Sequence, residues 1–207
     1  LLNLQGKQVI IFNAYGFMSG NRWDNFCHYN LGLNTGTAFI HNTIENMPIF
    51  DRISRYRKKY PEALIILSPH WSNDFNGDIS GLTPIARRAI KAGVDLILGH
   101  GPHIVLGMEK ILDKTVVYSI GDFVFNTTGL DIEKSGHKSY GAVSKLYFEN
   151  GKTQLRLYPI YIHRINTFFQ PLPVTSEQFE DFKSDFMGID AFETDKDHLG
   201  HFLQITL

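Results

Sequence analysis

The sequence predicts an α/β domain in which parallel βαβ units are followed by an antiparallel meander. In the first half, short apolar runs alternate with helical patterns, which is typical of parallel strands joined by crossover helices. In the second half, two strand-like segments flank Asn150-Gly151, a dipeptide typical of tight hairpins. With 207 residues the chain is long enough to bury a core without disulfides, so we expect one domain.

Three buried strands are expected in the first half, over Lys7 to Tyr15, Ala63 to Ser68 and Val94 to Leu98. Each contains an apolar run that is rich in branched residues and too short for a helix. The spacing of apolar residues from Ile49 to Tyr60 predicts an amphipathic helix. The segment from Phe17 to Thr43 follows neither a helical nor a strand period, so we expect a long irregular excursion there.

A second helix is predicted to begin with Thr83 as its N-cap and to end at Gly93. Pro84 suits the first helical position because its missing N–H is not needed there. The later elements follow from alternation, turn and capping signals: strands over Val116 to Ser119, Phe123 to Phe125, Ala142 to Phe148, Gln154 to Ile162 and His201 to Leu207, and a capped helix over Thr175 to Met187 with Phe179, Phe182 and Phe186 on one face.

The composition excludes some classes of partner. With 20 basic and 21 acidic residues, the formal charge is −1, so no global field attracts nucleic acid. No apolar run approaches the ~20 residues that span a bilayer, so no membrane-spanning segment is expected in this chain. The single cysteine, Cys27, excludes an internal disulfide, and a buried thiol is favoured over a nucleophile.

Three histidines stand at the ends of predicted parallel strands. His70 ends one strand, and His100 and His103 follow the next strand along the chain. Because the carboxyl ends of parallel strands share one edge of a sheet, we expect these imidazoles to converge, and imidazole is a common ligand of zinc, iron and manganese. The alternative is that they are ordinary polar loop residues. His28 and His41 remain further candidates for this site, because their loop is able to fold over it.

Three ordered segments resemble the bacterial capsule-synthesis family (CapA/PgsA type, poly-γ-glutamate synthesis) of the metallophosphatase-like superfamily. They are Ile65 to Trp71, Ala89 to Val105 and Val117 to Phe125. The family pattern has a strand into His-Trp-Gly-x-Glu, a helix into Ala-Gly-Ala-Asp, a Gly-His-His-Pro-His turn and a Tyr-Ser-Leu-Gly-Asn-Phe strand. The resemblance extends from roughly Lys7 to Ile162.

The resemblance implies the C-terminal part of an α-β-β-α sandwich with a divalent metal ion (manganese, zinc or iron) at the carboxyl strand ends. By the matched motifs, His70, His100 and His103 are metal ligands, and His103 is also the candidate catalytic residue. Trp71, Asp74 and Asp122 become candidates for substrate contact, although Trp71 fits a core position equally well. We expect residues 1–170 to form the metallophosphatase-like domain without its N-terminal part, and residues 171–207 to pack on it as a helix and a closing strand.

The sequence departs from the family pattern at three matched positions. Gly101 replaces the middle histidine of the turn, Ser72 replaces a glycine and Asp122 replaces an asparagine. The family's first metal-binding aspartate and its Asn-His and Glu-bearing loops precede the strand at Lys7, and none of these motifs occurs here. We therefore expect little or no hydrolysis by this segment alone, and residues upstream of Leu1 in the intact protein.

The function implied by the resemblance is to act on, or assist the synthesis or export of, an anionic polymer such as poly-γ-glutamate, with metal-dependent hydrolysis left open. It also implies a location in the cell envelope or on its outer face, with a membrane anchor outside this chain. Two alternatives remain. One is a metal-dependent phosphoesterase of another pathway, and the other is a non-catalytic polymer-binding scaffold with a degenerate metal site.

Overall fold

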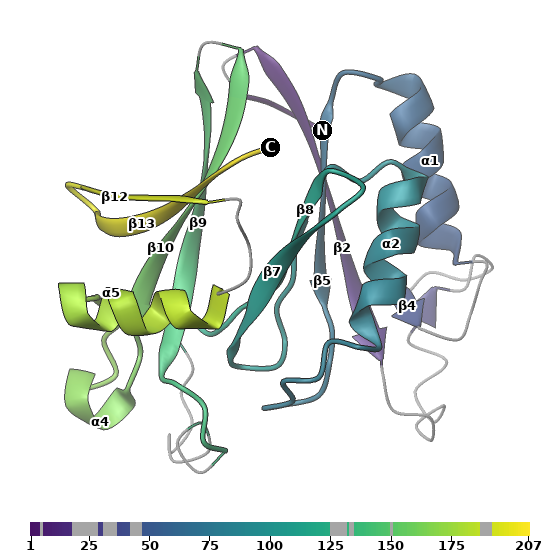
Figure 1. Cartoon of the computed structure of the whole chain (residues 1–207). Helices are drawn as coiled ribbons and strands as arrows, with labels where there is room; N and C mark the ends of the chain where they lie inside the picture. The colour runs from purple at the N-terminus through teal and green to yellow at the C-terminus, as the bar shows by residue number, and fades with distance from the viewer. Residues whose placement is uncertain are drawn as a thin grey trace.

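The computed structural model describes residues 1–4, 6–17, 29–30, 37–41, 47–124, 132, 135–149, 151–186 and 192–207. Two β-sheets are stacked, and a pair of helices covers the outer face of the first sheet (Figure 1). This mixture of parallel and antiparallel strands with few helices confirms the predicted α/β class.

The first sheet has the strand order β3-β4-β2-β5-β6-β8-β7, and β1 pairs with β2. The strands are β1 (Leu2–Leu4), β2 (Lys7–Phe17), β3 (Tyr29–Asn30), β4 (Thr37–His41), β5 (Leu64–His70), β6 (Leu96–Leu98), β7 (Val105–Ile111) and β8 (Lys114–Ile120). All neighbours on this path are parallel except β7 and β8, and β1 is antiparallel to β2. The carboxyl ends of β2, β5 and β6 therefore share one edge of the sheet.

The first sheet corrects three predictions. The strand predicted at Val116 to Ser119 is part of β8, which is parallel to β6 and antiparallel to β7, and the strand β7 itself was not predicted. Within the segment expected to be irregular, β3 and β4 are strands, and the stretches around them lie outside the described residues. Phe123 and Val124 form a bend and not the predicted strand, and Phe125 lies outside the described residues.

Helices α1 (Pro48–Lys59) and α2 (Leu82–Ala92) confirm the two predicted helices, but the capping of α2 differs. Its N-cap is Gly81, so the prediction of Thr83 as N-cap is wrong. The Thr83 hydroxyl lies inside the first turn, 2.7 Å from the hydroxyl of Tyr118, and this tertiary contact uses the oxygen that a cap would need. Gly93 ends α2 with φ 115°, the left-handed conformation expected of a closing glycine.

The second sheet is antiparallel and follows the predicted hairpin. It consists of β9 (Tyr140–Glu149), β10 (Lys152–Tyr161), β11 (Leu172–Pro173), β12 (Glu193–Asp197) and β13 (Gly200–Thr206). Gly151 turns between β9 and β10 with φ 74°, as the Asn-Gly signal predicts. The closing strand is confirmed by β13, which pairs with β10. The chain also forms the short helix α4 (Arg164–Thr167).

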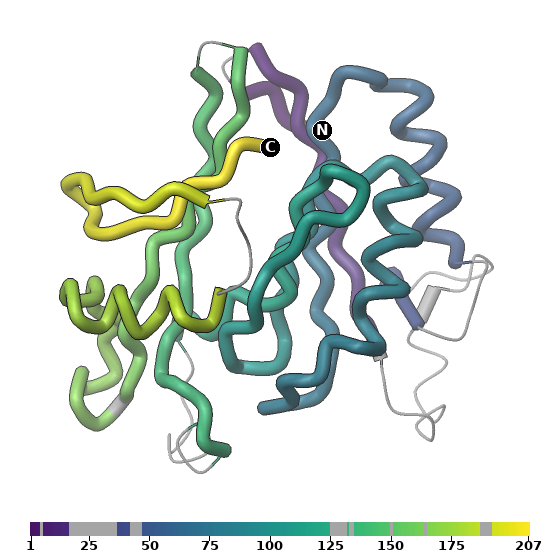
Figure 2. The backbone as a smooth tube through the Cα atoms, in the orientation of Figure 1, coloured from purple at the N-terminus to yellow at the C-terminus, as the bar shows by residue number. Residues whose placement is uncertain are grey.

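Helix α5 (Ser176–Lys183) confirms the predicted capped helix, and a 3-10 turn over Ser184–Phe186 extends it. Thr175 and Gln178 form a reciprocal capping box at its start. Its phenylalanines join the core between the two sheets, and α5 lies beside the second sheet in the backbone trace of Figure 2. The helix and the closing strand thus share a core with the first sheet.

Alternate residues of each central strand face opposite cores. On β5, Ile65 and Leu67 face the helices, whereas Leu64 and Ile66 face the second sheet. Burial on both faces explains why these strands are continuous apolar runs in the sequence. A fully buried Leu or Ile stabilises the fold by roughly 1.5–3 kcal/mol, so the double burial fixes the strand ends that carry the histidines.

Candidate functional site at the carboxyl strand ends

Backbone hydrogen bonds place His70 and His100 side by side. The two residues form a parallel bridge beyond the regular pairing of β5 with β6. The amide of His100 donates to the carbonyl of Pro69 at 3.0 Å, and the amide of Trp71 donates to the carbonyl of His100 at 2.8 Å. The predicted meeting of these two strand ends is therefore present in the structure.

The two imidazoles are in edge-to-face contact, with ring centroids 5.0 Å apart and planes at 81°. Tyr15, at the end of the neighbouring strand β2, stacks on the other side of His70 at 5.2 Å. Burial lowers the pKa of His70, an effect that nearby His103 reinforces and Asp74 opposes. Burial also lowers the pKa of His100, with a further contribution from His70. Both shifts favour the neutral imidazole, which is the form that binds metal ions.

His103 is held by the turn that follows β8. Its Nδ1 lies 2.9 Å from Oδ1 of Asp122, and its Nε2 lies 3.6 Å from Oδ1 of Asp74. The ring of Phe75 packs at 5.7 Å between centroids. His103 adopts φ 63°, a backbone conformation that costs energy for a residue with a Cβ. The structure thus gathers five predicted site residues around one edge of the sheet: His70, His100, His103, Asp74 and Asp122.

Asp122 is largely buried, and only one of its carboxylate oxygens has a hydrogen-bond partner among the described residues. Oδ1 meets His103, whereas Oδ2 is buried without a partner in that part of the chain. The preceding residue, Gly121, has φ 68°, and the backbone of Asp122 packs against Gly141 of β9 with no room for a side chain there. A buried carboxylate oxygen without a donor is unfavourable, so Asp122 offers a position for a proton donor or a cation.

Trp71 is fully buried, which corrects the prediction that it contacts a polymer. Its indole N–H donates to the carbonyl of Tyr118 at 2.7 Å, and the two rings stack at 6.0 Å. Gly16 and Gly99 both lie against Trp71, where a Cβ would clash. Trp71 therefore fixes the strand end behind His70, in accordance with the alternative that it is a core residue.

Gly101 allows the turn between His100 and His103 to approach β5. Its φ is 123°, and a Cβ built on it would lie 2.6 Å from the carbonyl oxygen of Trp71 and 3.2 Å from Cδ2 of His70. In the conformation described here, a histidine at this position would collide with the strand end. At Gly101, where the sequence departs from the family pattern, the turn thus packs directly against the end of β5.

No group of three or more His, Cys, Asp or Glu side chains within the described ranges is placed to hold a metal ion. His70 and His100 are adjacent, but His103 is directed to Asp122 and Asp74. The described residues therefore do not form a complete metal-ligand set. His41 is buried in β4 and stacks on Phe39, and Arg88 donates to its carbonyl; His28 lies outside the described residues.

Tyr15 is a site residue that sequence reasoning missed. It ends β2 in register with His70, and the same rule that placed the histidines would have placed it there. The adjacency of β2 and β5 was the information that the linear sequence lacked.

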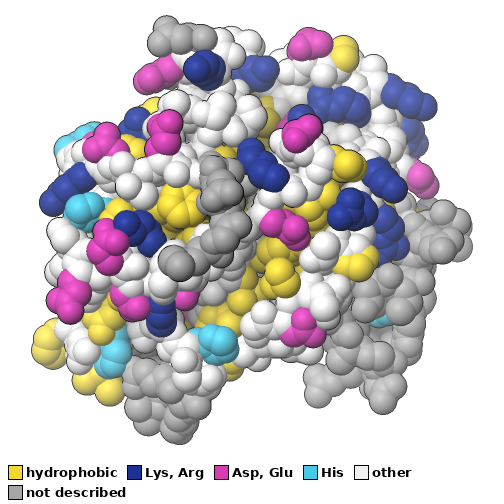
Figure 3. Space-filling view, viewed as in Figure 1, with side chains coloured by type: hydrophobic (Ala, Val, Ile, Leu, Met, Phe, Trp, Pro, Cys, Tyr) yellow, Lys and Arg dark blue, Asp and Glu magenta, His cyan; other side chains and the backbone are white. Residues whose placement is uncertain are grey.

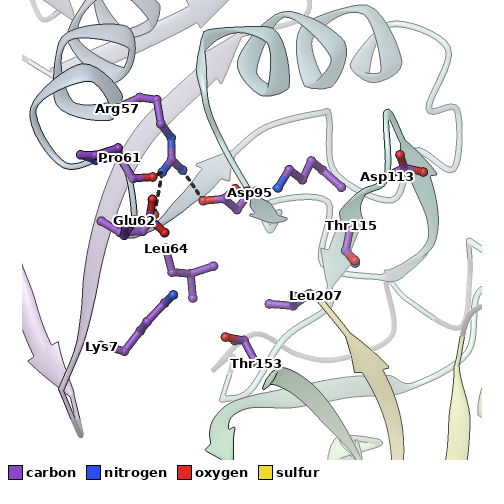
Figure 4. Close-up of a pocket in the computed structure, with 12 residues that line it drawn as sticks. Lys7, Arg57, Pro61, Glu62, Leu64, Asp95, Asp113, Thr115, Thr153 and Leu207 are labelled. Carbon is purple, nitrogen blue, oxygen red and sulfur yellow. Dashed lines mark hydrogen bonds and ion pairs between the residues drawn. The ribbon is translucent and has the colours of Figure 1, made fainter. Parts of the chain in front are cut away.

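A pocket of about 220 Å³ lies at the opposite end of the first sheet, where β2, β5 and β8 begin (Figure 4). Arg57 reaches into its wall, pairs with Asp95 and donates to the carbonyls of Pro61, Ala63 and Gly93. Lys114 bonds the other oxygen of Asp95 at 2.8 Å. These contacts join the segments at which the strands begin, and the pocket is separate from the histidine edge.

Among the described residues, no helix is both long enough and apolar enough to cross a bilayer.

Comparisons with known proteins agree with the sequence resemblance. Residues 1–127 match the family described as bacterial capsule synthesis protein PGA_cap. A PGA biosynthesis protein CapA of Bacillus subtilis (strain 168) is 27% identical over 124 residues, which is 59% of this chain and 30% of that protein.

Other relatives match a similar region. A capsule biosynthesis protein CapA of Bacillus anthracis is 28% identical over 120 residues, 58% of this chain and 27% of that protein. A probable polyglutamine synthesis accessory protein of Mycobacterium tuberculosis (strain ATCC 25618 / H37Rv) is 30% identical over 91 residues, 44% of this chain and 23% of that protein. The chain thus spans less than a third of the length of these curated relatives.

Proposed function

Since the chain belongs to the bacterial capsule synthesis protein family, we propose that it takes part in the synthesis or export of an anionic polymer such as poly-γ-glutamate at the cell envelope. The names of its relatives, which refer to capsule, PGA and polyglutamine synthesis, support this role. The structural observation that carries the proposal is the bridge of His70 to His100, which joins two family motifs at one edge of the sheet.

The proposal includes a divalent metal ion, manganese, zinc or iron, held by His70, His100 and His103. Its support is the adjacent imidazole pair, whose lowered pKa values favour the neutral form, and a buried oxygen of Asp122, beside His103, that has no hydrogen-bond partner among the described residues. Because the described residues do not complete a ligand set, we assign the remaining ligands to residues outside the described ranges. When bound, such an ion polarises phosphoryl or carbonyl oxygens and acidifies a bound water.

The residues of this chain have separate parts in the proposed site. His70 and His100 present adjacent imidazoles, and Trp71 holds the backbone behind them. Asp122 accepts the Nδ1 proton of His103, so that Nε2 faces Asp74. Asp74 is mostly exposed, and it is the acidic residue at which a substrate approaches.

A non-catalytic polymer-binding scaffold is the second candidate. The observation that favours it is the incomplete ligand set among the described residues, together with the packing of Gly101 where the family pattern has histidine. A phosphoesterase of another pathway is the third reading, since one fold hosts many functions.

Metal binding tests the central claim. Calorimetry with manganese and with zinc on the intact protein should show binding that H70Q/H100Q abolishes. H198Q is the matched control, because His198 is exposed and distant from the strand ends in sequence. Binding that survives H70Q/H100Q would place the ion elsewhere and remove the metal from the proposal.

Polymer chemistry separates the three readings. The intact protein with manganese should bind poly-γ-glutamate, and cleavage of the polymer would make it a hydrolase. Retention of polymer without metal binding would select the scaffold. Hydrolysis of a generic phosphodiester without retention of poly-γ-glutamate would select the phosphoesterase and overturn the proposed role.

A further inference from the structure

The helical layer formed by α1 and α2 carries a charge unlike that of the rest of the chain. These two helices contain 8 of the 20 basic residues and 1 of the 21 acidic residues, which leaves 12 basic against 20 acidic residues elsewhere. The layer therefore has a formal charge of +7 and the remainder −8. The overall value of −1 conceals a strongly basic face.

Six of the eight cations are exposed on this layer. They are Arg52, Arg55, Lys58, Lys59, Arg87 and Lys91. Figure 3 shows Lys and Arg side chains gathered over the region of these helices. None of the six makes an ion pair with another described residue, so their charges are available to a partner. The other two, Arg57 and Arg88, donate to main-chain carbonyls that hold the layer together.

The two helices pack in parallel and present one continuous face. Ser54 donates to the carbonyl of Ala92, and the Arg88 guanidinium lies 5.8 Å from the ring centroid of Phe50, so both helices run in the same direction. The residues that face outward at helical spacing are then Arg55 and Lys58 on α1 and Arg87 and Lys91 on α2. Four cations consequently line the same side of the protein.

Helix stabilisation does not account for this pattern. Basic residues in a last turn interact favourably with the helix macrodipole, which explains Lys58, Lys59 and Lys91. Arg52, Arg55 and Arg87 lie earlier in their helices, where that effect has faded. Closely spaced like charges on one surface repel one another, so the arrangement costs stability unless an anion binds.

We infer that the exposed face of α1 and α2 is a docking surface for an anionic polymer, whose carboxylates pair with Arg52, Arg55, Lys58, Lys59, Arg87 and Lys91. This deepens the proposed function and rests on it for the choice of polymer. Guanidinium groups suit carboxylates because they bind them through two parallel hydrogen bonds. The surface lies on the helical layer and is distinct from the histidine edge.

The composition of this face favours a polymer over a membrane. Helices that lie in a bilayer interface bury large apolar residues between their cations. Among the described residues of α1 and α2, one large hydrophobic residue is exposed. It is Tyr56, with 38% of its surface accessible. A face without apolar anchors binds through charge alone, so the interaction should weaken steeply with salt.

Retention on immobilised poly-γ-glutamate tests the inference with the full 207-residue chain. The variant R55Q/K58Q/R87Q/K91Q should bind about tenfold more weakly than the wild type, because four of the paired charges are removed. The matched control is K7Q/K145Q/K152Q/K196Q, which removes the same charge from strands and should stay within about twofold. Circular dichroism verifies that both variants fold.

The outcomes are distinct. Equal loss of affinity in both variants would show that net charge, and not this face, governs binding. If the helix variant binds as tightly as the wild type, the docking surface is overturned and the proposed function is left intact. Retention on polyacrylate but not on poly-γ-glutamate would keep the anion-binding face and reject the proposed polymer. Tighter binding to vesicles that contain anionic lipid than to the polymer would assign the face to a membrane and overturn the inference.

Discussion

Nδ1 of His103 and Oδ1 of Asp122 lie 2.9 Å apart, and this contact ties the turn after β6 to the turn after β8. A carboxylate accepts hydrogen bonds, so the imidazole donates through Nδ1 and keeps Nε2 for the side that faces Asp74. The chain achieves this with an aspartate where the family pattern has asparagine, and either side chain offers an oxygen acceptor.

The contact predicts the tautomer of His103. In ¹⁵N spectra of the metal-free chain, His103 should carry its proton on Nδ1 in the wild type and in D122N, whose amide oxygen accepts the same proton. D122A should shift the population toward the Nε2-protonated form. H103Q assigns the signals. A wild-type His103 protonated mainly on Nε2 would contradict the geometry, whatever the substitutions do to folding.

Substitution of Trp71 should destabilise the fold. W71F removes the indole donor and leaves the buried carbonyl of Tyr118 unpaired, which costs about 1–3 kcal/mol. W71A leaves a cavity as well and should cost about 3–5 kcal/mol. Urea denaturation measures both. Phe123 is 60% exposed, so F123A serves as the control and should change the free energy of unfolding by less than about 0.5 kcal/mol.

Restoring the family histidine at position 101 should harm the protein. G101H forces φ 123° on a residue with a Cβ and drives that Cβ toward the Trp71 carbonyl oxygen, so we expect a loss of about 1–3 kcal/mol. G136A isolates the contribution of backbone conformation, since Gly136 has φ 77° with no atom within 4 Å of a built Cβ. Thermal unfolding should show a clearly larger loss for G101H. Equal losses of stability would mean that the contact with Trp71 relaxes without a cost in free energy.

Stability should fall as the pH drops through about 6.5. The pKa of His70 and of His100 is lowered in the folded protein by burial, whereas in the unfolded chain each keeps its ordinary value of 6.5. Below pH 6.5 the unfolded chain binds protons that the folded chain does not bind. The free energy of unfolding therefore falls until the pH is below the pKa values of the folded protein. Urea unfolding between pH 8 and pH 5 measures the slope.

The variant H70Q/H100Q should reduce this slope, because it removes two of the described histidines whose pKa burial lowers, whereas His41, whose pKa burial also lowers, keeps its contribution. H198Q replaces an exposed histidine and should leave the slope unchanged. If the double variant retains the full wild-type slope, these imidazoles are not shielded from solvent as the structure places them.

The pair of Arg57 and Asp95 should stabilise the end of the sheet opposite the histidines. R57A removes the side-chain donor of the Gly93 and Ala63 carbonyls and one of the donors to the Asp95 carboxylate, which keeps the Ile65 N–H and Lys114. We expect this to cost on the order of 2 kcal/mol in urea denaturation. K114A removes a more exposed partner of the same carboxylate and should cost less than about 1 kcal/mol. A larger loss of stability in K114A than in R57A would show that Lys114, and not Arg57, is the main stabilising partner of Asp95.

Signals that act within a few residues predicted their elements well. Gly93, Gly151 and the Thr175 capping box each formed the turn or cap expected of them. Their hydrogen bonds close over short stretches of chain, so the local sequence contains both partners. Thr83 failed as a cap because its hydroxyl meets Tyr118, a residue 35 positions away.

Long-range pairing limited the rest of the prediction. Nothing in the run at Val116 to Ser119 distinguishes a parallel partner on β6 from an antiparallel one on β7, and β8 has both. The burial of Trp71 depends on the space that Gly16 and Gly99 leave, and these residues come from two other strands. The meeting of His70 and His100 was predicted because the shared edge of parallel strands is a property of the fold class.

Because Gly141 has no space for a side chain, the antiparallel sheet helps to determine the geometry of the histidine edge. Any side chain there would push against the Asp122 main chain and, through it, tilt the imidazole of His103. Across homologous chains, position 141 should therefore stay a glycine wherever this turn is kept, and should vary only in step with positions 121 and 122.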